Sequence, residues 1–428
     1  MKKTLLLSVV ASTMIMAGGD IAPVEPVIET PVVEASGWDF SGQAVLYYQT
    51  RDLTAARDLF DPESSAANSG IQLRAVNSDI AYGIGAGVEV SGLGTLGLQD
   101  ESIDLVDNTM QGTGGWISQA YLTYGFGNTA VKLGRQELPK SLSPFAFSEN
   151  WNVFKNTFDA ALVVNTDISD TTLVGAWVAK ANSSVNVKKF NGVNNAGIPS
   201  NSNAKNGTDQ GIFMATVQNK SIEGLTLTGT WYYASEWPDV YSRSGKNIST
   251  EDANILWVDA KFNVSNFNVA LQGGTIMSDA LADDSVAFGG KVGADYGMFS
   301  ASVAYSSTDE NANAIDGFKN VGGVKTPLYT QMILNQGVIR SDADYVKVAA
   351  SANLYGGTFG VAYGYAIANE DDLTGGKDNN PYELDVTYKT KVFNDSTTVF
   401  AGYVLENRDV QPNEDSNNML RFWARYNF

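Results

Sequence analysis

The sequence predicts an all-β protein: a transmembrane antiparallel β-barrel of about 18 strands, with 16 as the alternative. Three observations lead to this prediction. From Gly37 onward the chain repeats a unit of roughly ten residues in which polar and apolar side chains alternate. Tight turns and long polar connections follow one another along this repeat, as short periplasmic turns and long extracellular loops do in a barrel. The last segment, residues 419–428, alternates in the same way and ends on Phe428.

Composition agrees with such a barrel and argues against several other classes of protein. The chain has 428 residues, of which 43% are hydrophobic and 18% charged, with 42 glycines and a formal net charge of −19. Cysteine is absent, which excludes disulfides, thiolate metal sites and a lipoprotein anchor. Histidine is absent too, which removes the usual base of a Ser or Cys hydrolase. We therefore expect no enzyme, no cofactor, no metal site and no nucleic-acid partner.

The first residues are expected to lie outside the barrel. Two lysines precede a short apolar run at residues 5–16, and small residues follow it, so residues 1–19 match a cleavable secretory signal peptide. That run is shorter than the roughly 20 residues of a membrane-spanning helix. Residues 20–36 are spaced by prolines and glutamates, which predicts an extended periplasmic leader. Residues 37–428 would then form a single barrel.

The strands are assigned from their alternation. In the first, Phe40, Leu46 and Tyr48 share one face, whereas Asp39 and Gln43 lie on the other. Tight turns are expected where Gly and Asn cluster, for example at residues 91–94 and 127–128. The expected strands, in chain order, are 38–49, 71–90, 95–98, 116–126, 130–137, 158–166, 172–180, 211–218, 225–233, 255–264, 267–274, 286–294, 298–306, 345–354, 358–367, 381–391, 397–405 and 419–428.

The final strand predicts how the barrel closes. Phe422, Tyr426 and Phe428 fall on a face suited to lipid, while Arg421 and Arg425 fall on a face suited to water. Such an ending looks like the closing strand of an outer-membrane barrel, in which Tyr426 and Phe428 would serve as the signal read by the barrel-assembly machinery.

Two short motifs flank the connection at residues 138–157. These are Gly134-Arg135-Gln136 before it and Asn156-Thr157-Phe158 after it. The segment resembles the OprD-like outer-membrane porins and the related major outer membrane proteins of Gram-negative bacteria. This resemblance implies a barrel of 18 strands, commonly a homotrimer, whose third loop folds into the lumen and narrows it.

The residues of this third loop allow two interpretations of their own. Phe145, Phe147, Trp151 and Phe154 are too many aromatic side chains for a loop lying in water, so the loop should pack either against the inner wall or over a subunit interface. If it packs inward, its charges would stand at the pore constriction, although several could merely pair to pin the loop. These charges are Arg135, Glu137, Lys140, Glu149, Lys155 and Asp159.

Charges of both signs are expected along the lumen wall. They are Asp259, Lys261, Lys291, Lys347, Glu383, Asp385, Lys389, Arg421 and Arg425. The outer connections are acidic, which predicts a preference for cations at the mouth. The acidic residues could equally keep the surface soluble or bind divalent ions that bridge lipopolysaccharide. Their spacing lacks a calcium-loop signature, so the sequence gives only a weak indication of calcium binding. These residues are Asp100, Glu101, Asp104, Asp107, Asp279, Asp283, Asp284, Asp309, Glu310, Glu370, Asp371, Asp372, Glu406, Asp409, Glu414 and Asp415.

The function that best fits these features is passive diffusion of ions and small hydrophilic solutes through the outer membrane. A solute-selective channel is the first alternative, and an adhesin acting through its long loops is the second. The expected partners are outer-membrane lipid and lipopolysaccharide, the barrel-assembly machinery, two further copies of the chain, and the solutes themselves.

Overall fold

The computed structural model describes residues 37–52, 58–99, 103, 112–182, 187–193, 210–237, 251–278, 283–309, 318–334, 342–368, 380–407 and 417–428. The predicted signal peptide and leader, residues 1–19 and 20–36, lie outside these ranges. Most acidic residues of the outer connections do so as well, including the cluster at residues 370–372. Within the described ranges, no helix has both the length and the apolar character needed to cross a membrane.

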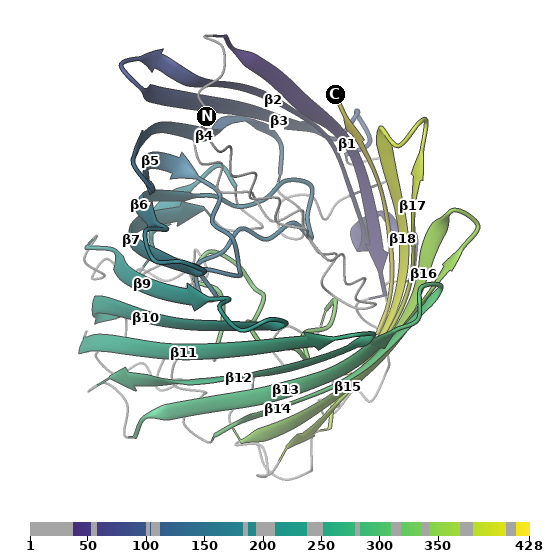
Figure 1. Ribbon diagram of the computed structural model, residues 1–428. Coiled ribbons are helices and arrows are strands. Elements are labelled where there is room, and N and C mark those ends of the chain that lie inside the picture. Colours follow the sequence, from purple (N-terminus) through teal and green to yellow (C-terminus); the bar gives the residue numbers. More distant parts are fainter. Residues whose placement is uncertain are drawn as a thin grey trace.

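The described strands close into an antiparallel barrel of 18 strands (Figure 1). Neighbours in the chain pair with each other around the ring, and β1 pairs with β19 to close it. A further short strand, β8 (Phe190–Gly192), pairs with the end of β7, while β9 continues the ring. The fold class and the count of 18 are therefore confirmed.

The bounds of the ring strands are β1 Asp39–Arg51, β2 Ser65–Ala81, β3 Ile84–Gly94, β4 Gly114–Phe126, β5 Thr129–Gln136, β6 Phe158–Asn165, β7 Thr171–Asn182, β9 Ile212–Asn219, β10 Leu225–Trp237, β11 Glu251–Val264, β12 Phe267–Ser278, β13 Ser285–Asp295, β14 Phe299–Thr308, β15 Ala343–Leu354, β16 Gly357–Ala368, β17 Tyr382–Val392, β18 Thr397–Asn407 and β19 Asn417–Asn427. One turn of 3₁₀ helix, η1 (Pro62–Ser64), precedes β2.

Alternating exposure distinguishes the two faces of the wall. On β19, Phe422 and Tyr426 are exposed, whereas Met419 and Arg421 are buried. On the paired strand β1, Leu46 is exposed in the same way. Because successive side chains of a strand point to opposite faces, the exposed apolar row covers the outside of the barrel and the buried row faces its interior.

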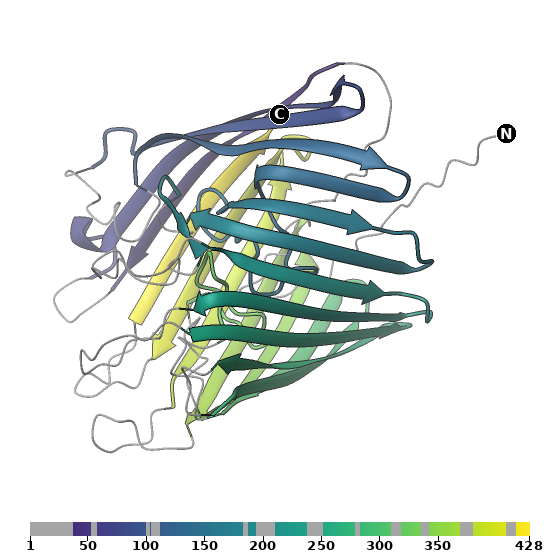
Figure 2. The ribbon, with the colours of Figure 1, turned by 90° about the vertical axis from the view of Figure 1, so that its left-hand side faces the viewer.

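Tight turns gather at one end of the barrel, on the right in Figure 2. At the turn between β2 and β3, Tyr82 and Gly83 both have positive φ, 54° and 80°. The prediction was wrong here: it placed a turn at residues 91–94, which lie within β3, and strands at 71–90 and 95–98. The turn could not be recognised from Tyr82, because an aromatic residue seldom takes a left-handed conformation. Aromatic residues are common in strands, so Tyr82 was assigned to a strand.

Two connections run inside the ring of strands (Figure 1). We call residues 138–157, between β5 and β6, the third-loop segment, and residues 318–334, between β14 and β15, the inner segment. The ring of Phe145 packs edge-on against Tyr232 of β10 and Trp257 of β11, with centroids 5.8 and 5.3 Å apart. Phe318 of the inner segment lies 6.2 Å from the same Phe145 ring. The main buried apolar cluster is thus built from both segments and the inner wall.

Candidate functional site

The motif at the start of the third-loop segment organises the root of the loop. Gly134 has a φ of 121°, and a Cβ at this position would collide with the carbonyl oxygen of Ala120. A glycine is therefore required here. The Gln136 side chain is fully buried and donates to the carbonyl of Ala160 on β6 at 3.0 Å. These contacts fix the direction in which the chain leaves the wall.

The motif Asn156-Thr157-Phe158 at the end of the loop fixes the direction in which the chain returns to the wall. Thr157 Oγ1 donates to the carbonyl of Ser118 at 2.9 Å. Its backbone N–H donates to the side chain of Asn182 at 2.6 Å. Phe158, the first residue of β6, is fully buried against the interior. Both ends of the third-loop segment are therefore anchored on neighbouring strands by side-chain hydrogen bonds.

Arg135 and Asp159 form an ion pair, with Nε and Oδ1 2.7 Å apart. On β6 the buried residues Phe158, Ala160 and Leu162 face the interior, so Asp159 projects from the opposite, outward face. Arg135 lies directly across from Asp159 in the β5–β6 register and points the same way. This placement differs from the expectation that both residues line the constriction.

Three other predicted constriction charges lie in the third loop and its root, and two of them form an ion pair. Lys155 Nζ lies 2.6 Å from Glu137 Oε2, and both side chains are partly exposed. Lys140 Nζ lies over the Phe147 ring, 5.3 Å from its centroid. The Lys155 and Glu137 side chains remain partly open to solvent, in contrast to the buried Glu149.

Glu149 has a different role from the one expected. Its side chain is 2% exposed, and its Oε1 accepts hydrogen bonds from Asn320 Nδ2 at 2.9 Å and from the backbone N–H groups of Val324 at 2.9 Å and Lys325 at 2.7 Å. Its Oε2 accepts the indole N–H of Trp151 at 2.7 Å. Because the carboxylate is enclosed by four donors, Glu149 joins the two segments instead of facing the channel.

The third-loop segment also touches opposite sides of the barrel. Thr216 of β9 donates to the carbonyl of Leu142 at 2.8 Å. On the far side, Tyr47 of β1 donates to the carbonyl of Trp151 at 3.2 Å. The segment therefore crosses the interior between these two parts of the wall.

Charges of the lumen wall hold the inner segment. Lys347 Nζ donates to the carbonyl of Gln331 at 2.6 Å. The backbone N–H of Leu334 donates to Glu383 Oε1 at 2.7 Å, and that of Ile333 donates to Asp385 Oδ2 at 3.3 Å. Three predicted wall charges thus bind backbone groups of a segment that lies against them.

Asp259 provides a further anchor for the inner segment, because the Tyr329 hydroxyl donates to its carboxylate. Burial raises the pKa of Tyr329, and the adjacent Asp259 charge raises it further, so the phenol stays protonated and able to donate. Lys261 Nζ lies 3.4 Å from the same carboxylate, and the Lys261 side chain is more exposed than that of Asp259.

The remaining predicted wall residues are also on inward positions. Lys291 and Arg421 are buried, and Lys389 is partly buried. Arg421 donates from Nη2 to the side-chain oxygen of Gln49 at 2.8 Å. Arg425 donates to the carbonyl of Val153 in the third-loop segment at 3.0 Å. The described interior therefore carries charges of both signs beside its buried apolar cluster.

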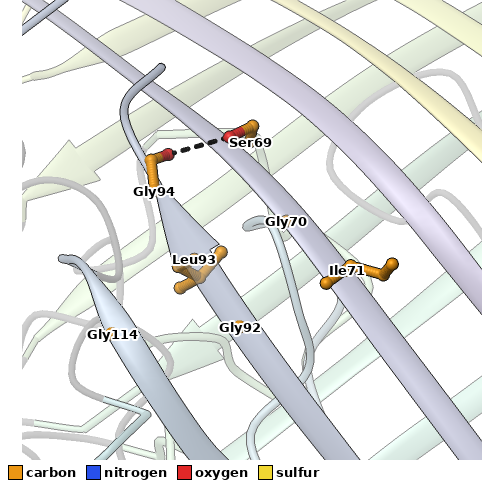
Figure 3. Close-up of a pocket in the computed structure, with 7 residues that line it drawn as sticks. All are labelled: Ser69, Gly70, Ile71, Gly92, Leu93, Gly94 and Gly114. Carbon is orange, nitrogen blue, oxygen red and sulfur yellow. Dashed lines mark hydrogen bonds between the residues drawn. The ribbon is translucent and has the colours of Figure 1, made fainter. Parts of the chain in front are cut away.

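A glycine-rich part of the wall forms a hollow of about 440 Å³ at β2, β3 and the start of β4 (Figure 3). Ser69 Oγ donates to the carbonyl of Gly94 at its edge, at 3.2 Å. The described residues that line this hollow are uncharged, and the Lys188 side chain lies beside Gly114 at its edge. At Gly70 an added Cβ would meet the Phe154 ring at 2.6 Å, which shows how closely the third-loop segment packs on this wall.

Comparison with known proteins supports the architecture. No protein-family model matches the chain, and no curated protein matches its sequence. Solved structures do match: OccK8 (OprE) of Pseudomonas aeruginosa has 14% identity and a TM-score of 0.68, over 91% of this chain and 98% of that one. OpdK of the same organism, solved with vanillate, has 15% identity and a TM-score of 0.67 over the same shares.

A BenF-like porin from Pseudomonas fluorescens has 12% identity and a TM-score of 0.69, again over 91% of this chain and 98% of the other. At such low identity the likeness concerns the fold. The chain therefore has the closed 18-strand barrel fold of these porins.

Proposed function

We propose that the protein is an outer-membrane porin through which ions and small hydrophilic solutes diffuse passively. The observation that supports this most directly is the closed ring of strands with an apolar exterior and an interior that carries charges of both signs. Purified protein added to a planar lipid bilayer should produce stepwise increases in current. An adhesin would leave the bilayer current unchanged, and that result would overturn the proposal.

The pore is proposed to prefer cations. The chain carries a formal net charge of −19, much of it in the outer connections, while the described wall has charges of both signs. A reversal potential measured across a gradient of potassium chloride should have the sign of cation selectivity at low salt. The preference should weaken as salt rises, because ions screen the field. Anion selectivity at low salt would contradict it.

A solute-selective channel is the alternative to passive diffusion. One structural neighbour was solved with vanillate, an aromatic carboxylate, and the interior of this chain holds several cationic side chains. Liposome-swelling rates for cationic, neutral and anionic solutes of matched size would separate the two functions. A passive porin should admit all three, with differences set by charge, whereas a selective channel should favour one chemical class well beyond that difference.

The remaining expectations stand as proposals of the same kind. Export would depend on a cleavable signal at residues 1–19, and insertion on the barrel-assembly machinery. In the membrane the protein would contact lipopolysaccharide and form a homotrimer. Amino-terminal sequencing of the mature protein and native gel migration would test the cleavage site and the oligomeric state.

A further inference from the structure

The third-loop segment and the inner segment are joined by a backbone hydrogen bond and by several hydrogen bonds from side chains. Val321 N–H donates to the carbonyl of Phe145 at 2.9 Å. The Asn320 side chain accepts from the Phe147 N–H at 2.9 Å and donates to the Phe147 carbonyl at 2.8 Å. Asn156 Nδ2 donates to the carbonyl of Gly322 at 2.8 Å. Segments far apart in the sequence are therefore joined by hydrogen bonds to backbone groups of both.

Two glycines allow this close approach. A Cβ at Gly322 would meet Asn156 Nδ2 and the Phe158 ring, both at 2.8 Å. A Cβ at Gly323 would collide with the carboxylate of Glu149. The described residues around Glu149 thus leave room for a hydrogen atom and for nothing larger at residue 323.

The Glu149 carboxylate is the centre of this junction. A buried charge is tolerated only when hydrogen bonds replace its hydration, and here two backbone N–H groups and the Asn320 amide of the inner segment do so. The fourth donor, Trp151, belongs to the third-loop segment itself. Removing the carboxylate would leave buried donors of both segments without an acceptor, which is costly.

We propose that Glu149 locks the two segments into a single unit, so that they open and close together and the width of the channel is set at their junction. This inference rests on the proposed pore function for its effect on current. The locking itself concerns only the two segments and can be tested without any current.

Each segment also has its own anchor on the wall, which makes the junction separable. Thr216 holds the third-loop segment at Leu142, and Asp259 holds the inner segment at Tyr329. Loosening the junction should therefore increase local motion without detaching either segment from the barrel.

The test compares Glu149→Gln with Glu223→Gln, and Gly323→Ala with Gly175→Ala. Glu223 is exposed in the tight turn between β9 and β10, and a Cβ at Gly175 would meet nothing within 4 Å, so both serve as matched controls. Heat-modifiable migration on a gel would first establish that each variant is a folded barrel. If Glu149→Gln fails to fold, Gly323→Ala carries the test.

Trypsin gives the first readout. Lys325 of the inner segment is 3% exposed in the intact junction, so cleavage there requires local opening. We expect Glu149→Gln and Gly323→Ala to speed cleavage after Lys325 by about tenfold or more, the scale of one lost charge-assisted hydrogen bond. The two controls should cleave like the parent protein. A cleavage rate at Lys325 that is unchanged in both junction variants would overturn the proposal.

Single-channel recording gives the second readout. The junction variants should show larger current fluctuations and an added high-conductance level that the controls lack. Combining Glu149→Gln with Asn320→Ala should add little to either single change, because both remove the same junction. If the parent protein carries no current at all, the proposed porin function fails, while the trypsin result still decides whether the junction locks the segments.

Discussion

Deleting Phe428, or replacing it with a polar residue, is expected to reduce the amount of assembled barrel sharply. Phe428 forms the last rung of the seam at which β19 meets β1: its N–H donates to the Gly42 carbonyl at 3.0 Å, and its carbonyl accepts the Gly42 N–H at 2.8 Å. A barrel has no free edge only if this seam closes along its whole length. The measurement is the heat-modifiable band in outer-membrane fractions of cells producing each variant.

Gly42 offers an independent test of the same seam. The Phe428 ring covers Gly42, and an added Cβ would meet that ring at 2.7 Å and the carbonyl oxygen of Gln72 at 2.5 Å. Gly42→Val should therefore lower assembly even though Phe428 is intact. Gly229→Val is the matched control, since no atom lies within 4 Å of a Cβ there. Normal assembly of both the Phe428 and the Gly42 variants would contradict the role given to the seam.

Most of the fold could be predicted because alternation is a local property of a strand. A segment such as residues 255–264 carries its two faces in its own sequence, and β11 is found there. The hairpin of β2 and β3 could not be placed because its turn uses Tyr82 in a conformation that usually requires Gly or Asn. Local signals therefore give the two faces of a strand more reliably than the position of every turn, and the count of 18 was reached with residues 71–90 taken as one strand and residues 95–98 as another.

The interior was harder to predict because its contacts join distant parts of the chain. Glu149 meets Asn320 and Lys325 across more than 170 positions, so its sequence neighbours say nothing of its partners. The inner segment was missed altogether. Its apolar residues, such as Phe318 and Leu328, and its Gly322-Gly323 pair were a usable sign of packing in a connection otherwise expected to be polar.

For the charged side chains too, the sequence predicts the face of a strand but not the contacts with distant segments. The alternation within β6 could have placed Asp159 outward, had the strand's inner row of Phe158, Ala160 and Leu162 been identified first. The wall charges Lys347, Glu383 and Asp385 fall on inward positions, as alternation predicts, but their bonds to the inner segment depend on a fold of the loop that no local pattern encodes.

Deleting residues 141–152 is expected to leave a folded barrel and to raise its single-channel conductance strongly. All ring strands keep their pairing partners, since the deleted residues contribute no rung to any strand ladder. The deletion removes Phe145 from the wall residues Tyr232 and Trp257, which opens space in the interior. It also removes Glu149, so the inner segment loses its junction as well.

The change in single-channel conductance distinguishes three possible arrangements of the third-loop segment. If the two segments are locked together, the deletion should raise conductance beyond the high level seen in Glu149→Gln, because the loop's own volume is removed in addition to the lock. If the segments are independent, Glu149→Gln should resemble the parent and only the deletion should widen the pore. If the third-loop segment instead covers a subunit contact, the deletion should dissociate the oligomer and leave the conductance of each barrel unchanged. Native gel migration and single-channel recording of one preparation distinguish these outcomes, and the contacts of Phe145 with the inner wall favour the first.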